Sequence, residues 1–102
     1  MPTPVSPRIL IVDDEAEITE ILADLLSEDY DCSRAGSAED ALTRLRDDEF
    51  QLVISDITMP GMSGLDMIPH VKELAPDTVV VMISGMQTVE SAISALRVGA
   101  FD

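Results

Sequence analysis

Three acidic residues and a serine directly follow apolar segments of this 102-residue sequence. Asp13 and Asp14 come after the first apolar segment, Asp56 after the third and Ser84 after the fourth. Two carboxylates 4 Å apart repel each other by ~4 kcal/mol at an effective dielectric constant of about 20, so three such groups require a divalent cation or raised pKa values. Oxygen ligands on short loops favour Mg²⁺, and a carboxylate beside Mg²⁺ can accept a phosphoryl group as an acyl phosphate.

Each of these residues has an ordinary structural role when it is considered alone. Asp56 would cap a turn or the helix beginning near Gly64, Asp14 would cap a helix, and Ser84 would be a turn hydroxyl. Their joint occurrence at the carboxyl ends of the apolar segments favours a functional site over these separate roles.

The elements that must position these residues alternate regularly along the chain. Apolar segments predict strands over 8–12, 30–35, 50–55 and 78–83, with 30–35 the outer one because it carries more polar residues. Helical periodicity predicts helices over 15–28, from Ser37 onward, over 64–74 and over 88–98. Their expected inward residues are, in order: Ile18, Ile21, Leu22, Leu25 and Leu26; Ala38, Ala41, Leu42 and Leu45; Leu65, Ile68, Val71 and Leu74; Val89, Ala92, Ile93 and Leu96. This order predicts a parallel, doubly wound α/β sheet, whose carboxyl edge gathers the polar residues.

Composition limits the classes of function that remain. The chain has the length of one small domain, expected over 8–102 after a loose proline-rich lead-in at 1–7. A formal charge of −14 and a pI near 4.1 argue against direct nucleic-acid binding and favour cations and basic partner surfaces. A single cysteine, the lack of an 18-residue apolar run and the lack of a signal peptide predict a cytoplasmic location without membrane attachment.

The combined motifs carry a resemblance that covers the chain from Arg8 onward. Asp13-Asp14, Asp56 followed by Met59-Pro60-Gly61 and Gly64, and Ser84-Gly85 resemble the receiver domain of two-component response regulators. The resemblance implies a flavodoxin-like sheet with strand order 2-1-3-4. It also implies a signalling switch that is not an enzyme beyond catalysing its own phosphorylation and dephosphorylation.

The same resemblance implies roles for individual residues. Asp56 would accept a phosphoryl group from a sensor histidine kinase or a phosphotransfer protein. Asp14, Asp56 and the backbone carbonyl of Thr58 would bind Mg²⁺, with Asp13 reaching the metal largely through water. Ser84 would be the switch hydroxyl, and Thr58 and Met86 would flank the phosphoryl group. An output domain would lie beyond residue 102.

The sequence departs from the receiver pattern at its end. The fifth strand, with its phosphoryl-binding lysine, and the fifth helix are not in this chain, and Lys72 falls on the third helix. We therefore expect a fragment of a longer protein that transfers phosphoryl groups weakly, since losing one such partner costs about 10²- to 10³-fold in rate. The strand over 78–83 would then be an edge that favours a homodimer or an exchange of elements.

Three rival functions differ in chemistry. A hydrolase with an aspartate nucleophile would need a second acid two residues further on and a lysine, and a flavin-binding module would need hydroxyls and glycines where Asp13-Asp14-Glu15 stand. The remaining alternative is a receiver-like protein interaction module that does not turn over phosphate.

Overall fold

Strands and helices alternate through the part of the chain that the computed structural model describes, residues 7–83. The strands are β1 (Arg8–Val12), β2 (Asp31–Ala35), β3 (Leu52–Asp56) and β4 (Val79–Ile83). The helices are α1 (Ala16–Leu26), α2 (Ala38–Asp47) and α3 (Gly64–Leu74). Every element predicted within residues 7–83 is present, and the boundaries shift by one or two residues.

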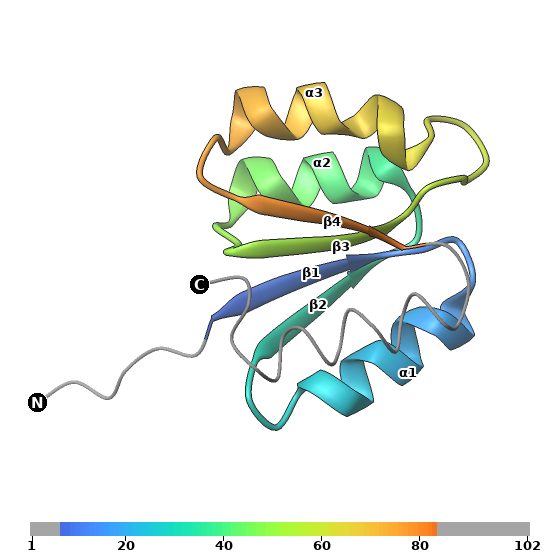
Figure 1. The fold of residues 1–102 in the computed structure, drawn as a ribbon, viewed down its shortest axis with the longest axis vertical. Helices are drawn as coiled ribbons and strands as arrows, with labels where there is room; N and C mark the ends of the chain where they lie inside the picture. Colours follow the sequence, from blue (N-terminus) through green and yellow to red (C-terminus); the bar gives the residue numbers. More distant parts are fainter. Residues whose placement is uncertain (1–6, 84–102) are drawn as a thin grey trace, which may run out of the picture.

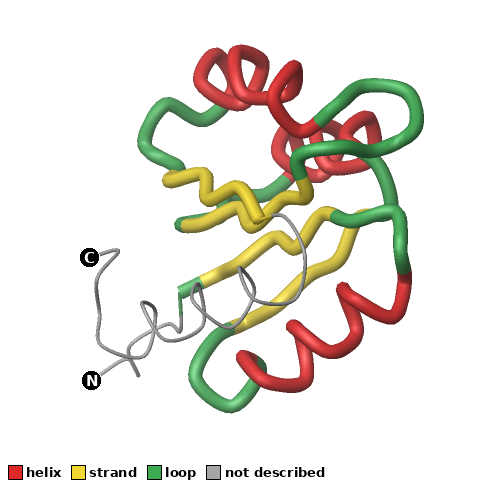
Figure 2. The backbone as a smooth tube through the Cα atoms, turned by 45° about the vertical axis from the view of Figure 1, so that its right-hand side comes forward, coloured by secondary structure: helices red, strands yellow, loops and turns green. Residues whose placement is uncertain are grey.

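The four strands form one parallel sheet in the order β2-β1-β3-β4, which confirms the predicted order and the outer position of β2. Within the described residues, β4 is the other edge. Helices α2 and α3 cover one face of the sheet and α1 lies on the opposite face (Figure 1). The turned view in Figure 2 shows the same three-layer arrangement.

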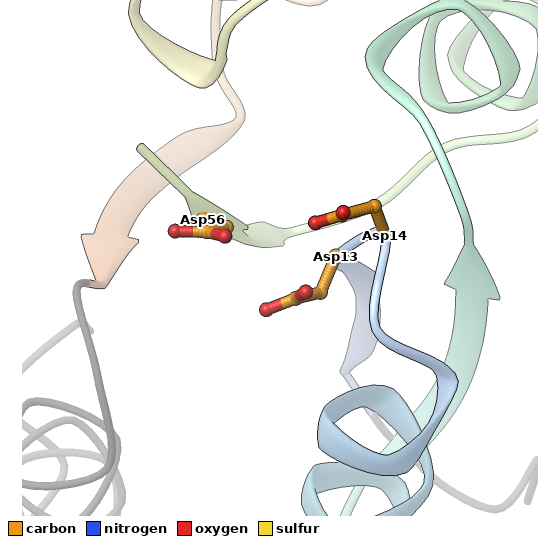
Figure 3. Close-up of side chains that lie close together, drawn as sticks. All are labelled: Asp13, Asp14 and Asp56. Atoms are coloured by element: carbon orange, nitrogen blue, oxygen red, sulfur yellow. The ribbon is translucent and has the colours of Figure 1, made fainter. Parts of the chain in front are cut away.

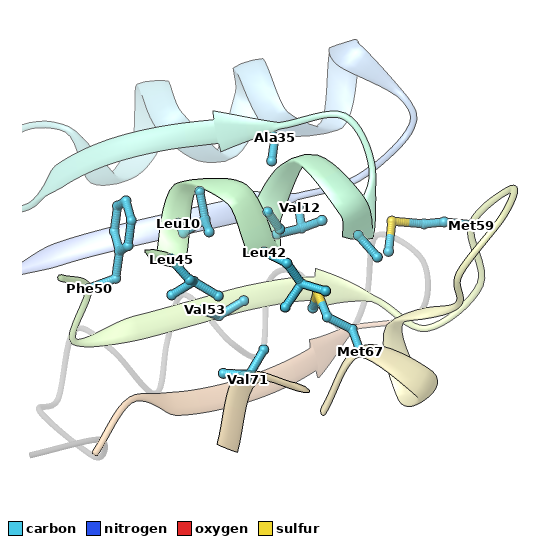
Figure 4. Packing of buried hydrophobic residues seen from close by; sticks show 12 residues of the cluster. Leu10, Val12, Ala35, Leu42, Leu45, Phe50, Val53, Met59, Met67 and Val71 are labelled. Carbon is cyan, nitrogen blue, oxygen red and sulfur yellow. The ribbon is translucent and has the colours of Figure 1, made fainter. Parts of the chain in front are cut away.

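The sheet has a hydrophobic core on each face, because successive residues of its inner strands β1 and β3 are apolar. Leu10, Val12 and Val53 belong to the core beneath α2 and α3 (Figure 4). Ile9, Ile11, Leu52 and Ile54 belong to the core beneath α1. Successive side chains of a strand point to opposite faces, so a continuous apolar run supplies both cores at once.

Serine caps determine where α2 and α3 begin. The side chain of Ser37 accepts a hydrogen bond from the backbone N–H of Asp40 at 3.0 Å, and Ser63 accepts one from the N–H of Asp66 at 3.0 Å. Each bond satisfies an N–H group that has no partner within the helix. The predicted start of α2 is confirmed, and its four expected inward residues are all buried.

The predicted inward faces of α1 and α3 are partly wrong. Ile21 and Leu25 are 39% and 45% exposed, because α1 packs through the narrower line of Leu22 and Leu26. On α3, Leu65 is 57% exposed and Leu74 is 39% exposed. The buried residues of α3 are Gly64, Met67 and Val71, so Val71 is inward as predicted, whereas Gly64 and Met67 were not predicted. Gly64 lies against the backbone of Asp56, the last residue of β3.

Several predictions concern residues outside the described range. Ser84, Met86 and the helix expected over 88–98 lie there, as does nearly all of the lead-in predicted at 1–7. None of the helices in residues 7–83 is long and apolar enough to cross a membrane.

Candidate metal centre

Asp13, Asp14 and Asp56 meet at the carboxyl edge of the sheet. Asp13 and Asp14 follow the last residue of β1, and Asp56 is the last residue of β3. Their side chains extend into the same space from the ends of the two strands (Figure 3). One carboxylate oxygen from each residue lies within 4.8 Å of the other two, so the three groups can bind one ion together.

Strand register explains why these residues meet. Strands β1 and β3 are parallel neighbours, and Val12 pairs with Ser55. The residues that follow this pair are Asp13 and Asp56, so the ladder itself places them side by side. The backbone N–H of Asp13 also donates to the carbonyl oxygen of Ala35 at 3.1 Å, which ties the end of β1 to the end of β2.

Asp13 is the most buried of the three acids, at 5% exposed. Burial raises the pKa of its carboxyl above the ordinary 3.8, and the hydrogen bond from the backbone N–H of Glu15 opposes this effect. The negative charges of Asp56, Asp14 and Glu15 raise the pKa of Asp13 further. Without a cation, the cluster therefore penalises the ionised form of this carboxyl.

The donor set suits Mg²⁺. Asp14 is exposed and Asp56 is half-buried, so the three carboxylates surround a place that water also reaches. Mg²⁺ binds carboxylate and water oxygens at about 2.0–2.1 Å, and it usually keeps several water ligands. Three carboxylate oxygens within 4.8 Å of one another are close enough to share one such cation, with solvent completing its shell.

The loop that follows Asp56 is bonded at both ends. The N–H of Ile57 donates to the carbonyl oxygen of Ile83 at 3.2 Å, and the N–H of Gly64 donates to the carbonyl oxygen of Ile57 at 2.9 Å. Between them, Met59 is buried among the residues beneath α2, and Gly61 has a φ of 79°. Thr58 lies exposed in this loop, between Ile57 and Met59.

The hydrogen bond from Ile57 to Ile83 also brings the end of β4 beside Asp56. Ser84 is the next residue along the chain, so the end of β4 lies on the same edge as the acids. Ser84 and Met86 themselves are outside the described residues. A pocket of about 320 Å³ lies at the other end of the strands and is lined by Phe50, Leu74 and Thr78 among others. It contains none of the predicted site residues.

Two residues beside the site had no predicted role. Ser55 is fully buried, and its hydroxyl donates to the carbonyl oxygen of Asp56 at 3.0 Å. Gly64 lies against the same carbonyl group. The sequence marks both residues as unusual, because Ser55 is a polar residue in an apolar strand and Gly64 is a glycine at the start of a helix.

The chain belongs to the response regulator receiver domain family, whose model matches residues 9–102. This confirms the resemblance found in the sequence motifs. The receiver fold is also that of a solved CheY-like receiver domain protein from Methanospirillum hungatei, which is 29% identical with a TM-score of 0.76. That match covers 92% of this chain and 76% of the other. The predicted flavodoxin-like architecture is therefore correct.

Relatives of known sequence are larger proteins. The response regulator protein PilR of Pseudomonas aeruginosa is 36% identical over 96 residues, which cover 93% of this chain and 22% of PilR. The DNA-binding transcriptional regulator NtrC of Azospirillum brasilense is 32% identical over 95 residues, which cover 92% of this chain and 20% of NtrC. The chain thus spans about a fifth of the length of these curated relatives.

Proposed function

We propose that this chain is a phosphorylation-dependent switch of a two-component system, in which Asp56 accepts a phosphoryl group in the presence of Mg²⁺. The observation that supports this most strongly is the meeting of Asp13, Asp14 and Asp56 within 4.8 Å at the carboxyl edge of the sheet. Asp14, Asp56 and the backbone carbonyl of Thr58 would hold the ion, with Asp13 bound to it largely through water.

In the proposed reaction, a carboxylate oxygen of Asp56 attacks the phosphorus of a phosphohistidine. A phosphorus–oxygen bond forms, the phosphorus–nitrogen bond breaks, and the electron pair stays on the departing imidazole nitrogen. Mg²⁺ would neutralise charge on the oxygens of the transferred group. The half-buried position of Asp56 at a strand end suits this role, because its carboxylate is both fixed by the sheet and open to a donor.

Three further residues receive proposed roles near the phosphoryl group. Ser84 would bind one of its oxygens after transfer and so report phosphorylation to the rest of the fold. Thr58 and Met86 would flank the group and affect its hydrolysis. The exposure of Thr58 and the hydrogen bond joining Ile57 to Ile83 are consistent with these positions.

The proposed phosphoryl donor is a sensor histidine kinase or a phosphotransfer protein, and the proposed location is the cytoplasm. The strongly acidic surface favours a basic docking face on that partner. Because the relatives are full-length regulators such as PilR and NtrC, we propose that phosphorylation of this domain controls an output domain.

Titration with Mg²⁺ and then with beryllofluoride, a mimic of the phosphoryl group, tests the proposed function. A working acceptor responds to both, and the beryllofluoride response requires Mg²⁺ and disappears in Asp56→Asn. A chain that binds Mg²⁺ but never beryllofluoride would instead be a receiver-like interaction module that does not turn over phosphate. The exposed His70→Gln substitution on α3 is a suitable control, because His70 lies outside the acidic site.

A further inference from the structure

Gly64, the first residue of α3, lies directly against the backbone of Asp56. A Cβ atom at position 64 would overlap the carbonyl oxygen of Asp56, and it would lie 3.1 Å from both the carbonyl carbon of Asp56 and Oγ of Ser55. Gly61 is the glycine with a positive φ in the described residues, so Gly64 is needed for space and not for an unusual backbone conformation. The obstructing atoms are mainly backbone atoms, which cannot rotate away as a flexible side chain would.

Hydrogen bonds fix the same short stretch of backbone. The peptide group that joins Asp56 to Ile57 is bonded through both of its polar atoms, because its carbonyl accepts from the Ser55 hydroxyl at 3.0 Å and its N–H donates to Ile83 at 3.2 Å. The next carbonyl, that of Ile57, accepts from the N–H of Gly64 at 2.9 Å. Ser55 is fully buried, so water does not compete for its hydroxyl.

We propose that Gly64 and Ser55 are positioning residues for the phosphoryl acceptor. Together they set the place of the Asp56 backbone, and thereby the distance of its carboxylate from those of Asp13 and Asp14. This inference rests on the proposed function, in which the three carboxylates bind Mg²⁺. Mg²⁺ tolerates little deviation from its short octahedral bonds, so a small displacement of one carboxylate weakens binding. Residues that orient metal ligands typically affect metal affinity by about 10- to 100-fold.

The chain offers a matched control for Gly64. A Cβ atom at Gly36 would meet nothing within 4 Å, so Gly36→Ala adds the same methyl group without displacing the acceptor. The Mg²⁺ dissociation constant is measured on each variant at a temperature where circular dichroism shows it fully folded. We expect it to rise about 10-fold in Gly64→Ala and to stay within twofold of wild type in Gly36→Ala. Loss of stability alone would not change the affinity of the folded protein. A folded Gly64→Ala protein with wild-type Mg²⁺ affinity would therefore overturn the inference.

Ser55→Ala provides a second test if Gly64→Ala does not fold. It removes a hydroxyl without adding volume, and we expect the Mg²⁺ dissociation constant to rise several-fold. An unchanged constant would then refute the proposal.

The carboxyl carbon chemical shift of Asp13, measured without Mg²⁺, separates this inference from the proposed function. It should change in Gly64→Ala but not in Gly36→Ala even if the chain binds no Mg²⁺, and no change would overturn the inference.

Discussion

A carboxylate oxygen of Asp13 accepts a hydrogen bond from the backbone N–H of Glu15 at 2.9 Å. Glu15 immediately precedes α1, so Asp13 orders the start of that helix while its side chain also meets Asp14 and Asp56. The same carboxylate thus has a structural role at α1 and a proposed role beside the metal. Its replacement should therefore change the stability of the metal-free protein and, separately, weaken ion binding.

Asp13→Asn should stabilise the metal-free protein at neutral pH. The folded-state pKa of Asp13 is raised, mainly by burial, so the favourable contribution of the protonated carboxyl is fully present below pH 3.8 and is lost as pH rises through the folded-state pKa. Asparagine cannot ionise, and its side-chain oxygen can still accept from Glu15.

Urea denaturation of both proteins between pH 3 and 7 measures this effect. Asp13→Asn should be the more stable at pH 7, and the difference should shrink toward pH 3. Addition of Mg²⁺ at pH 7 should favour the wild type instead. A difference that does not vary with pH would contradict the raised pKa of Asp13.

Ser37→Ala and Ser63→Ala should each lower the free energy of unfolding by about 1 kcal/mol, because each removes the side-chain cap of one helix. The two caps are on different helices, so the effects should add in the double variant. Chemical denaturation of the two single variants and the double variant measures this. Threonine at either position keeps the hydroxyl and should recover most of the loss.

Thr78→Val should destabilise the fold without weakening Mg²⁺ binding. The buried Thr78 hydroxyl donates to the carbonyl oxygen of Phe50 at 2.7 Å, and valine leaves that carbonyl without this partner. An unsatisfied buried polar group costs about 1–3 kcal/mol. Because Thr78 precedes β4, at the opposite end of the strands from the acids, the Mg²⁺ dissociation constant of the folded variant should equal that of wild type.

Gly61→Ala should cost about 1–2 kcal/mol, because a φ of 79° is unfavourable for a residue with a Cβ atom. The new methyl group would also meet Oε2 of Glu39 at 2.9 Å, but this flexible side chain can move. Comparing the thermal unfolding of Gly61→Ala with that of Gly36→Ala isolates the cost of the positive φ. Equal melting temperatures for the two variants would show that the loop adopts another conformation.

The sequence predicted the order of elements and the meeting of the acids, because both follow from regular features of parallel sheets. Continuous apolar runs specify strands buried on both faces, and parallel strands bring their carboxyl ends to one edge. The sequence alone therefore predicted that Asp13 and Asp56 lie at the same edge of the sheet.

The rotations of α1 and α3 could not be predicted as well as that of α2. Apolar residues at helical spacing on α3 correctly placed Val71 inward but also placed Leu65 there, whereas Gly64, which lies close to Asp56, and Met67 are the other buried residues. The contact of Gly64 with Asp56 is possible because glycine has no side chain, and a pattern of hydrophobic residues does not reveal such a contact. The role of Ser55 likewise depends on the local backbone path after β3.

Calorimetric titration with Mg²⁺ tests the central claim most directly. The account predicts one Mg²⁺ bound per wild-type chain, with binding strongly weakened in Asp14→Asn and in Asp56→Asn and unchanged in His70→Gln. If the folded wild-type chain bound no Mg²⁺, or bound it equally well after loss of the Asp56 carboxylate, the three acids would not form a metal centre.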